Sequence, residues 1–207
     1  MIAPDMAITD AGESKAWDLL AASDPATVCA HAGADFDPRE GTYRVSSFGR
    51  VFTVNPVERL ILGSEPGSEV FLTRYVSLFR LSLLWYLLKA TAARPSGKLV
   101  NPTGLPGGDI FLKGSHVLPL DALAAKYATR PEAFLESGAA LGGIPAAYGN
   151  AAVVLSPLPK VPVTILLWTE DDEFPARAGL LFDATCTAHL PLDVLWSVAL
   201  MSVLPLQ

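Results

Sequence analysis

Hydrophobic and polar positions alternate with a period of two in three short segments near the start of the chain. These segments are residues 42–46, 50–54 and 59–62. Such alternation places successive side chains on opposite faces, as in a half-buried strand. Phe48-Gly49 and Asn55-Pro56 separate the segments and are typical of turns. The pattern predicts a small antiparallel meander.

A second set of strands is predicted in the last third of the chain. Residues 158–168 form an apolar, β-branched run bounded by prolines, and residues 178–183 form another apolar run. The acidic segment 169–175 separates the two runs. We therefore expect a buried hairpin with an acidic turn, preceded by a strand at residues 151–155.

Two long apolar segments are expected to be helices. Residues 69–90 carry apolar side chains around most of the helical circumference, which is typical of a helix in the middle of a fold, and residues 192–204 form an apolar helix near the end of the chain. Neither reaches the roughly 18 uninterrupted apolar residues that a membrane span requires. Shorter helices are predicted at residues 13–22 and after Thr129, whose hydroxyl would cap the helix together with Glu132.

These elements predict a single α+β domain over residues 1–207. Its antiparallel sheet would combine the early meander with the late hairpin and pack against the long buried helix and the C-terminal helix. A chain of 207 residues that is 51% hydrophobic has enough apolar surface for one substantial core.

Charge and cysteine content exclude several classes of function. The net charge is −6, and no basic stripe is present, so nucleic-acid binding is not expected. Two cysteines are too few for a disulfide framework or for an iron–sulfur cluster held within this chain. The first residues lack the basic start and apolar stretch of a secretory signal, which predicts a cytoplasmic protein.

One candidate metal site combines two thiols with two imidazoles. These are the side chains of Cys29, His31, Cys186 and His189. Zinc and iron prefer such a set, although the two halves lie at opposite ends of the chain and neither has a finger spacing. The alternative is that the cysteines are small buried hydrophobic residues.

His116 is the candidate cofactor ligand. It follows Lys113-Gly114-Ser115 and the glycine pair Gly107-Gly108, and a histidine in such a setting can bind the iron of haem or the cobalt of a corrinoid, or act as a general base. Gly107, Gly108 and Lys113 would complete the cofactor site. The alternative is a histidine that bonds a backbone carbonyl at a corner of the fold.

The acidic turn offers a third candidate site. Asp171, Asp172 and Glu173 could together hold a divalent metal ion or supply an acid/base pair. The alternative is a solvated turn, or one that pairs with Arg177. The chain contains no P-loop, no dinucleotide-binding glycine fingerprint and no nucleophile elbow.

Several short motifs together resemble an uncharacterised prokaryotic family, a domain of unknown function found mainly in anaerobes. The motifs are Gly97-Lys98, Leu105-Pro106-Gly107-Gly108, Gly114-Ser115-His116, Leu158-Pro159-Lys160-Val161-Pro162, Trp168-Thr169-Glu170-Asp171-Asp172-Glu173-Phe174-Pro175 and Leu181-Phe182-Asp183. Residues 95–207 are the best-matching segment. Some members of that family carry an added iron–sulfur domain like the one on corrinoid proteins. The resemblance therefore implies redox or corrinoid-linked metabolism, with any cluster supplied by another protein.

The function expected from these features is that of a non-catalytic accessory or cofactor-binding protein of anaerobic metabolism. In this view the 107–116 loop and the acidic turn form one face. One alternative is a metal-dependent enzyme that uses the acidic turn and His116. Another is a structural subunit that buries apolar surface against a protein partner or in a homo-oligomer.

Overall fold

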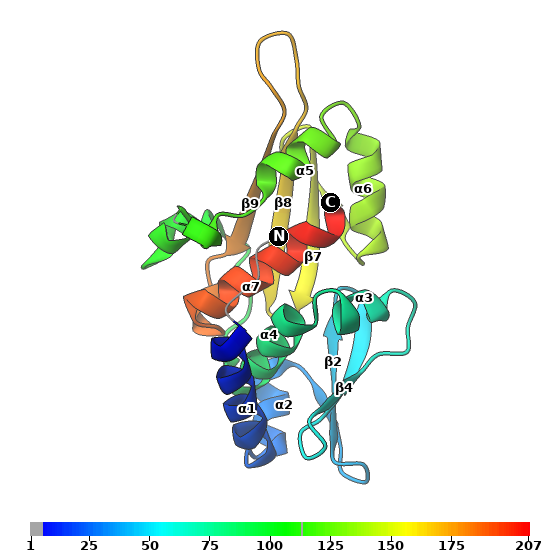
Figure 1. The fold of residues 1–207 in the computed structure, drawn as a ribbon, viewed down its shortest axis with the longest axis vertical. Coiled ribbons are helices and arrows are strands. Elements are labelled where there is room, and N and C mark those ends of the chain that lie inside the picture. Colours follow the sequence, from blue (N-terminus) through cyan, green and yellow to red (C-terminus); the bar gives the residue numbers. More distant parts are fainter. Residues whose placement is uncertain (1–5, 113) are drawn as a thin grey trace.

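The chain is described by a computed structural model that covers residues 6–112 and 114–207 (Figure 1). The described residues form two antiparallel sheets with helices packed against them, so the predicted α+β class is confirmed. The α-helices are α1 (Met6–Ala21), α2 (Pro25–Ala32), α3 (Ser68–Thr73), α4 (Val76–Lys89), α5 (Leu120–Lys126), α6 (Pro131–Ala140) and α7 (Leu192–Val203). None of the described helices is long and apolar enough to cross a membrane.

The predicted meander is the four-stranded sheet. Its strands follow the order of the chain: β1 (Asp35–Asp37), β2 (Thr42–Ser47), β3 (Arg50–Asn55) and β4 (Leu60–Leu62). Phe48 and Gly49 connect β2 to β3 with φ angles of 49° and 70°, as in the two-residue hairpin turn whose twist matches that of the strands. The alternating pattern thus placed both the strands and this turn correctly.

The predicted hairpin lies in a separate, five-stranded sheet. The strand order is β5 (Leu99–Val100), β9 (Arg177–Asp183), β8 (Val161–Trp168), β7 (Ala151–Leu158) and β6 (Ile144–Ala146). The expectation that the meander and the hairpin share one sheet is therefore wrong. β6 pairs with residues 152–154 of β7, and no strand of the meander pairs with a strand of this sheet among the described residues.

The two sheets nevertheless touch at the turn between β2 and β3. The amide of Phe48 donates to the carbonyl of Ser156 at 2.8 Å, and the hydroxyl of Ser47 donates to the carbonyl of Pro157 at 2.6 Å. At the same place a Cβ on Gly142 would lie 2.7 Å from the Cα of Gly49. Two glycines therefore allow the turns that follow β2 and α6 to pack backbone against backbone.

The long buried helix predicted at residues 69–90 is broken into α3 and α4. Tyr75 has φ −115° and ψ 22°, outside the helical region, and α4 begins at the next residue. The break lets each helix place a phenylalanine on the four-stranded sheet: Phe71 stacks on Phe48 at 4.6 Å between ring centroids, and Phe79 lies 4.6 Å from Phe52. The apolar pattern indicated the burial but not the bend.

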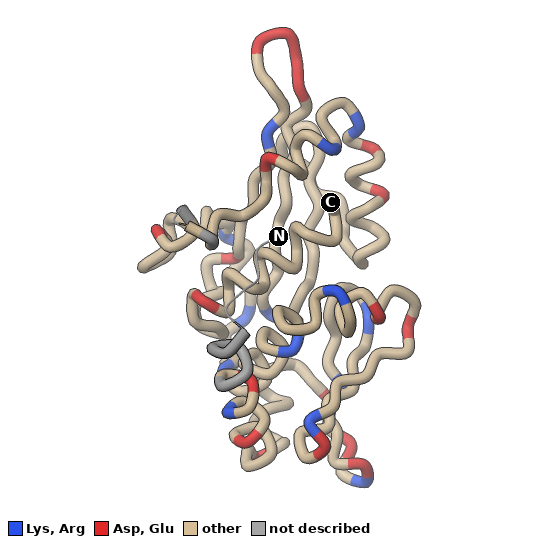
Figure 2. Tube along the Cα trace, in the orientation of Figure 1, with Lys and Arg blue, Asp and Glu red and all other residues tan. Residues whose placement is uncertain are grey.

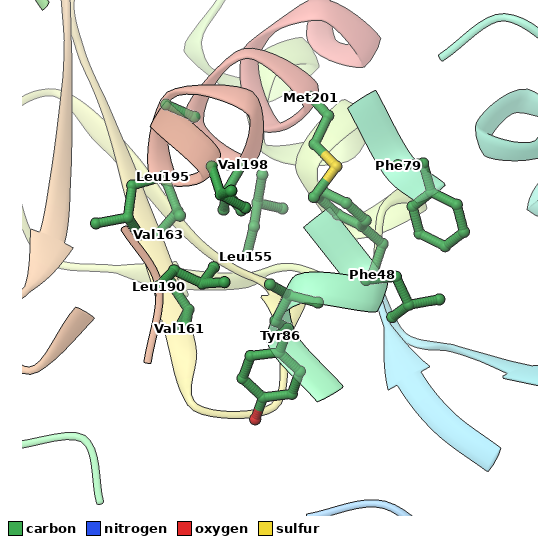
Figure 3. Packing of buried hydrophobic residues seen from close by; sticks show 14 of the residues in the cluster. Phe48, Phe79, Tyr86, Leu155, Val161, Val163, Leu190, Leu195, Val198 and Met201 are labelled. Carbon is green, nitrogen blue, oxygen red and sulfur yellow. The ribbon is translucent and has the colours of Figure 1, made fainter. Parts of the chain in front are cut away.

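Helix α7 is the predicted C-terminal helix, and it covers the five-stranded sheet. Figure 3 shows Leu195 and Val198 of α7 close to Val163 and Leu155 of the sheet, and all four side chains are fully buried. Met201 of α7 lies in the same cluster, on the side towards α4, and the two helices pack together. The core therefore runs through both sheets, with α4 near its centre.

One helix was not predicted, and one predicted helix cap is wrong. Asp24-Pro25 begins α2, because the Asp24 carboxylate accepts the amide of Thr27 and proline fits the first helical position. The predicted cap at Thr129 does not form, since α6 begins after Arg130, which makes no side-chain cap. The helix starts at Pro131, because proline fits the first helical position, and this makes Arg130 the residue before the helix.

Candidate functional site

A lysine in the turn between β7 and β8 binds the end of helix α2. The ammonium group of Lys160 donates to the carbonyls of His31 and Thr91, the latter at 2.8 Å. The hydroxyl of Tyr86 donates to the carbonyl of Ala32 at 2.8 Å and accepts the amide of Lys160 at 3.2 Å. The last carbonyls of a helix have no partner within it, and a cation is favourable at that end.

His189 lies fully buried beside this lysine. Its Nδ1 accepts the amide of Thr91 at 3.2 Å, so the proton of the neutral ring is on Nε2. Burial lowers the pKa of His189, and the positive charge of Lys160 lowers it further. Nε2 has no hydrogen-bond partner among the described residues. With its one lone pair engaged by Thr91, this imidazole has no nitrogen left to bind a metal.

Asp183 ends β9 and binds the loop that follows α4. Its carboxylate accepts the amide and hydroxyl of Ser96, the amide of Gly97 at 2.6 Å, and the amide and hydroxyl of Thr185. Burial by itself would raise the pKa of Asp183, but the hydrogen bonds outweigh it and lower the pKa to about 2. The carboxylate is therefore ionised in the folded protein at neutral pH.

Together Tyr86, Lys160, Asp183 and His189 form what we call the polar clamp. It holds the loop of residues 90–98 at two points, Thr91 and Ser96-Gly97. This loop leads into β5 and then into the segment that carries His116. The ammonium and carboxylate of the clamp are engaged by backbone groups, so their evident role is to position this part of the chain.

The four side chains of the predicted thiol–imidazole metal site do not converge. The described residues contain no group of three or more His, Cys, Asp or Glu side chains that could hold a metal ion. Burial raises the pKa of the half-buried Cys29, and Asp35 raises it further, whereas Cys186 is fully buried near Asp183. Lys160 and Thr91 link the segment of Cys29 and His31 to that of Cys186 and His189. The Lys160 ammonium binds the backbone carbonyls of His31 and Thr91, and the Thr91 amide donates to the His189 ring.

We expect the two thiols to react at very different rates. Burial raises the pKa of Cys186 to about 11, so almost no thiolate forms there at pH 8, and reagent cannot reach it. In a kinetic assay with Ellman's reagent, Cys29 should react first and Cys186 only after unfolding in guanidinium chloride. Equal rates for the two thiols in the folded protein would contradict this placement.

His116 lies at the end of a segment of residues 101–117 that projects from the body of the molecule (Figure 1). The segment contains three short 3-10 turns: η1 (Pro102–Gly104), η2 (Gly108–Leu112) and η3 (Gly114–His116). Trp196 of α7 donates its indole N–H to the carbonyl of His116 at 2.9 Å, and the two rings meet edge to face at 5.0 Å. The His116 ring is half-buried, and no hydrogen bond engages its nitrogens among the described residues.

The other residues of the predicted cofactor site have different roles or lie outside the structure. A Cβ on Gly108 would lie 2.0 Å from the carbonyl oxygen of Pro102, so this glycine is needed for the turn itself. Gly107 has a φ of 78°, a conformation that favours glycine. Lys113 lies outside the described residues. Of the four, His116 is the one with an ionisable side chain that the structure describes.

The acidic turn is remote from His116. It forms the tip of the β8–β9 hairpin, at the top of Figures 1 and 2, whereas the 101–117 segment projects from the side of the molecule. The Asp171 carboxylate accepts the amides of Glu173 and Phe174, at 3.0 and 2.8 Å, and Asp172 and Glu173 are exposed. Arg177 lies over the Trp168 ring at 5.6 Å. The structure does not bring the two sites onto one face.

Lys160, Tyr86 and Thr91 were not among the candidate residues found in the sequence. Lys160 lies between two strands that are otherwise apolar, and a lysine in that position is buried only when it has partners. This lysine within an otherwise apolar pattern was the feature of the sequence that could have identified Lys160 as a candidate. Nothing in the local sequence marks Tyr86 or Thr91, whose partners are distant along the chain.

Comparison with known proteins identifies one family. The chain matches the family profile of a domain of unknown function, DUF3786, over residues 24–204. No curated protein and no solved structure matches it. The match extends well before residue 95, where the best-matching segment was expected to begin, and it starts at Asp24, the residue that caps α2. The chain therefore belongs to the DUF3786 family, a domain of unknown function.

Proposed function

We propose that this protein is a non-catalytic, cytoplasmic accessory protein that binds a cofactor through the segment of residues 101–117. In this proposal the imidazole of His116 is the group that contacts the cofactor. The observation that carries it is the placement of His116, which is half-buried against Trp196, while no described residue makes a hydrogen bond to its ring nitrogens.

The charged groups of the polar clamp are hydrogen-bonded within the chain, and this supports a binding role of the protein over a catalytic one. A general acid, base or nucleophile needs a polar atom that can reach substrate. The Lys160 ammonium instead binds two carbonyls, and the Asp183 carboxylate binds three amides and two hydroxyls. Both groups are committed to the fold.

The donor chemistry of His116 fits a metal centre held in a tetrapyrrole. An imidazole nitrogen is a common axial ligand of haem iron, and it is suited to corrinoid cobalt as well. The hydrogen bond from the Trp196 indole to the His116 carbonyl attaches His116 to helix α7. The neighbouring Val117 is 55% exposed and offers apolar surface. The resemblance to relatives with an iron–sulfur domain favours redox or corrinoid-linked metabolism of anaerobes, with a protein partner that supplies the cluster.

The proposal predicts that purified protein binds hemin or cob(II)alamin and that His116→Ala weakens this binding at least about tenfold. Anoxic protein would be titrated with each compound and followed by its absorption spectrum. His31→Ala is the matched control, because it removes another half-buried imidazole and leaves the His31 carbonyl in place.

The expected result is a spectral shift that saturates at one equivalent, is lost in His116→Ala and is kept in His31→Ala. No shift with either compound would overturn the proposal. Equal binding by His116→Ala and the unaltered protein would overturn the role of His116.

A further inference from the structure

One face of the four-stranded sheet carries several exposed side chains, although Thr42 on the same face is buried. The inner face of the sheet carries the buried residues Tyr43, Phe52 and Val54, and in Figure 1 α4 lies between this sheet and the body. The register places two rows of side chains on the outer face: Asp37, Thr42, Asn55 and Leu60 in one, and Asp35, Arg44, Thr53 and Leu62 in the other. Leu60 and Leu62 are 41% and 53% exposed.

Two depressions mark this surface. One, of about 420 Å³, lies at the edge strand β1 and the β1–β2 turn. It is lined by Asp35, Phe36, Asp37, Pro38, Arg39 and Arg44. The other, of about 370 Å³, lies over β3 and β4 and is lined by Leu60, Leu62 and residues that include Glu40 and Glu58. Each depression is thus lined by both apolar and charged side chains.

Four charged side chains at the rim make no ion pair with the residues that the structure describes. Arg39 and Arg44 line the first depression, and Glu40 and Glu58 line the second. When arginines lie on one side of a surface and glutamates on the other, a two-fold axis between the two sides brings opposite charges together. An isologous contact between two copies requires such complementarity.

We propose that this outer face binds the same face of a second copy of the chain, with a two-fold axis that runs parallel to the strands. Both the β1–β2 turn (residues 38–41) and the β3–β4 turn (residues 56–59) follow the first row of side chains, at the same end of the sheet. The axis exchanges the two sides of the sheet. It therefore sets Arg39 against Glu58 of the other copy and Leu60 and Leu62 over the other copy's first depression. This inference does not depend on the proposed cofactor site.

The size of the face sets the strength of the contact. Four strands at about 4.8 Å spacing and up to six residues at about 3.3 Å give a face of about 19 by 20 Å. Stable interfaces bury about 800 Å² on each partner, so this contact is small. We expect a reversible dimer that forms at high micromolar concentration and dissociates on dilution.

Sedimentation velocity over a range of protein concentrations tests the proposal, with charge reversals at the predicted pair. Arg39→Glu and Glu58→Arg should each weaken self-association at least about tenfold, because each brings like charges together twice in the dimer. An equimolar mixture of the two variants should restore dimers, since both contacts then pair opposite charges. Leu62→Lys should also weaken the dimer.

Ile144→Lys is the matched control, because Ile144 is 70% exposed on β6 of the other sheet. It should leave the dimer unchanged. A protein that stays monomeric at every concentration would overturn the proposal. So would a dimer that is disrupted by Ile144→Lys, or one whose charge-reversed variants do not rescue each other on mixing.

Discussion

Asp183→Asn is expected to lower the free energy of unfolding by about 2–4 kcal/mol at pH 7, one of the two largest effects we predict. The asparagine side chain still accepts hydrogen bonds at one oxygen. Its NH₂ group, however, faces the amide of Gly97, which the carboxylate binds at 2.6 Å. The replacement therefore sets donor against donor in a buried place and removes the charge that strengthens the other bonds. Urea unfolding followed by circular dichroism measures the change.

The dependence of the free energy of unfolding on pH is a second test of Asp183. Its pKa of about 2 in the folded protein lies below the ordinary 3.8, so the unfolded chain takes up the proton first as the pH falls. The stability contributed by the carboxylate is complete above about pH 4 and is lost between pH 4 and pH 2. Asp183→Asn should lack that part of the acid dependence.

Asp172→Asn is the matched control for both measurements. Asp172 is an exposed acid at the hairpin tip, so its replacement should change stability by less than about 0.5 kcal/mol. If Asp183→Asn behaved like Asp172→Asn, the loop of residues 90–98 would not depend on this carboxylate for its position.

Lys160→Met is expected to destabilise the protein by about 2–4 kcal/mol. Methionine preserves the length and apolar stem of the side chain but leaves the carbonyls of His31 and Thr91 without their donor. It also removes a positive charge near His189. We therefore expect the pKa of His189 to rise in the variant, although burial, the larger cause, still holds it below its usual value.

Lys98→Met is the control, because Lys98 is exposed and its side chain makes no hydrogen bond or ion pair among the described residues. Urea unfolding should separate the two variants, and an NMR titration of the histidine ring protons should report the pKa of His189. Equal stability of Lys160→Met and Lys98→Met would show that the lysine is not needed at the end of α2.

Periodicity located most elements of this fold. The meander, the hairpin and the C-terminal helix were predicted within a few residues, because each has a clear apolar pattern and turn residues at its ends. Helix α2 was missed because it is only eight residues long, although Asp24-Pro25 is a favourable helix start. The bend at Tyr75 was missed because both halves of the segment are apolar.

Few features of the candidate site could be predicted from the sequence. Histidine and cysteine residues at the two ends of the chain were correctly noted as chemically capable, but whether their side chains converge depends on the fold. The clamp residues Tyr86, Lys160 and His189 bond backbone atoms more than 50 residues away. Backbone carbonyls and amides are the same at every position, so no local pattern identifies them as partners.

The α+β class, the two sets of strands and the apolar helices can be predicted from the amino-acid pattern, because each depends on side-chain spacing within a few residues. Three other features are seen only in the folded chain: the strands form two sheets, Lys160 and Asp183 hold the loop of residues 90–98, and His116 lies apart from the acidic turn. These features depend on which distant backbone groups meet when the apolar surfaces are buried together, and such meetings are set by the packing of the whole chain.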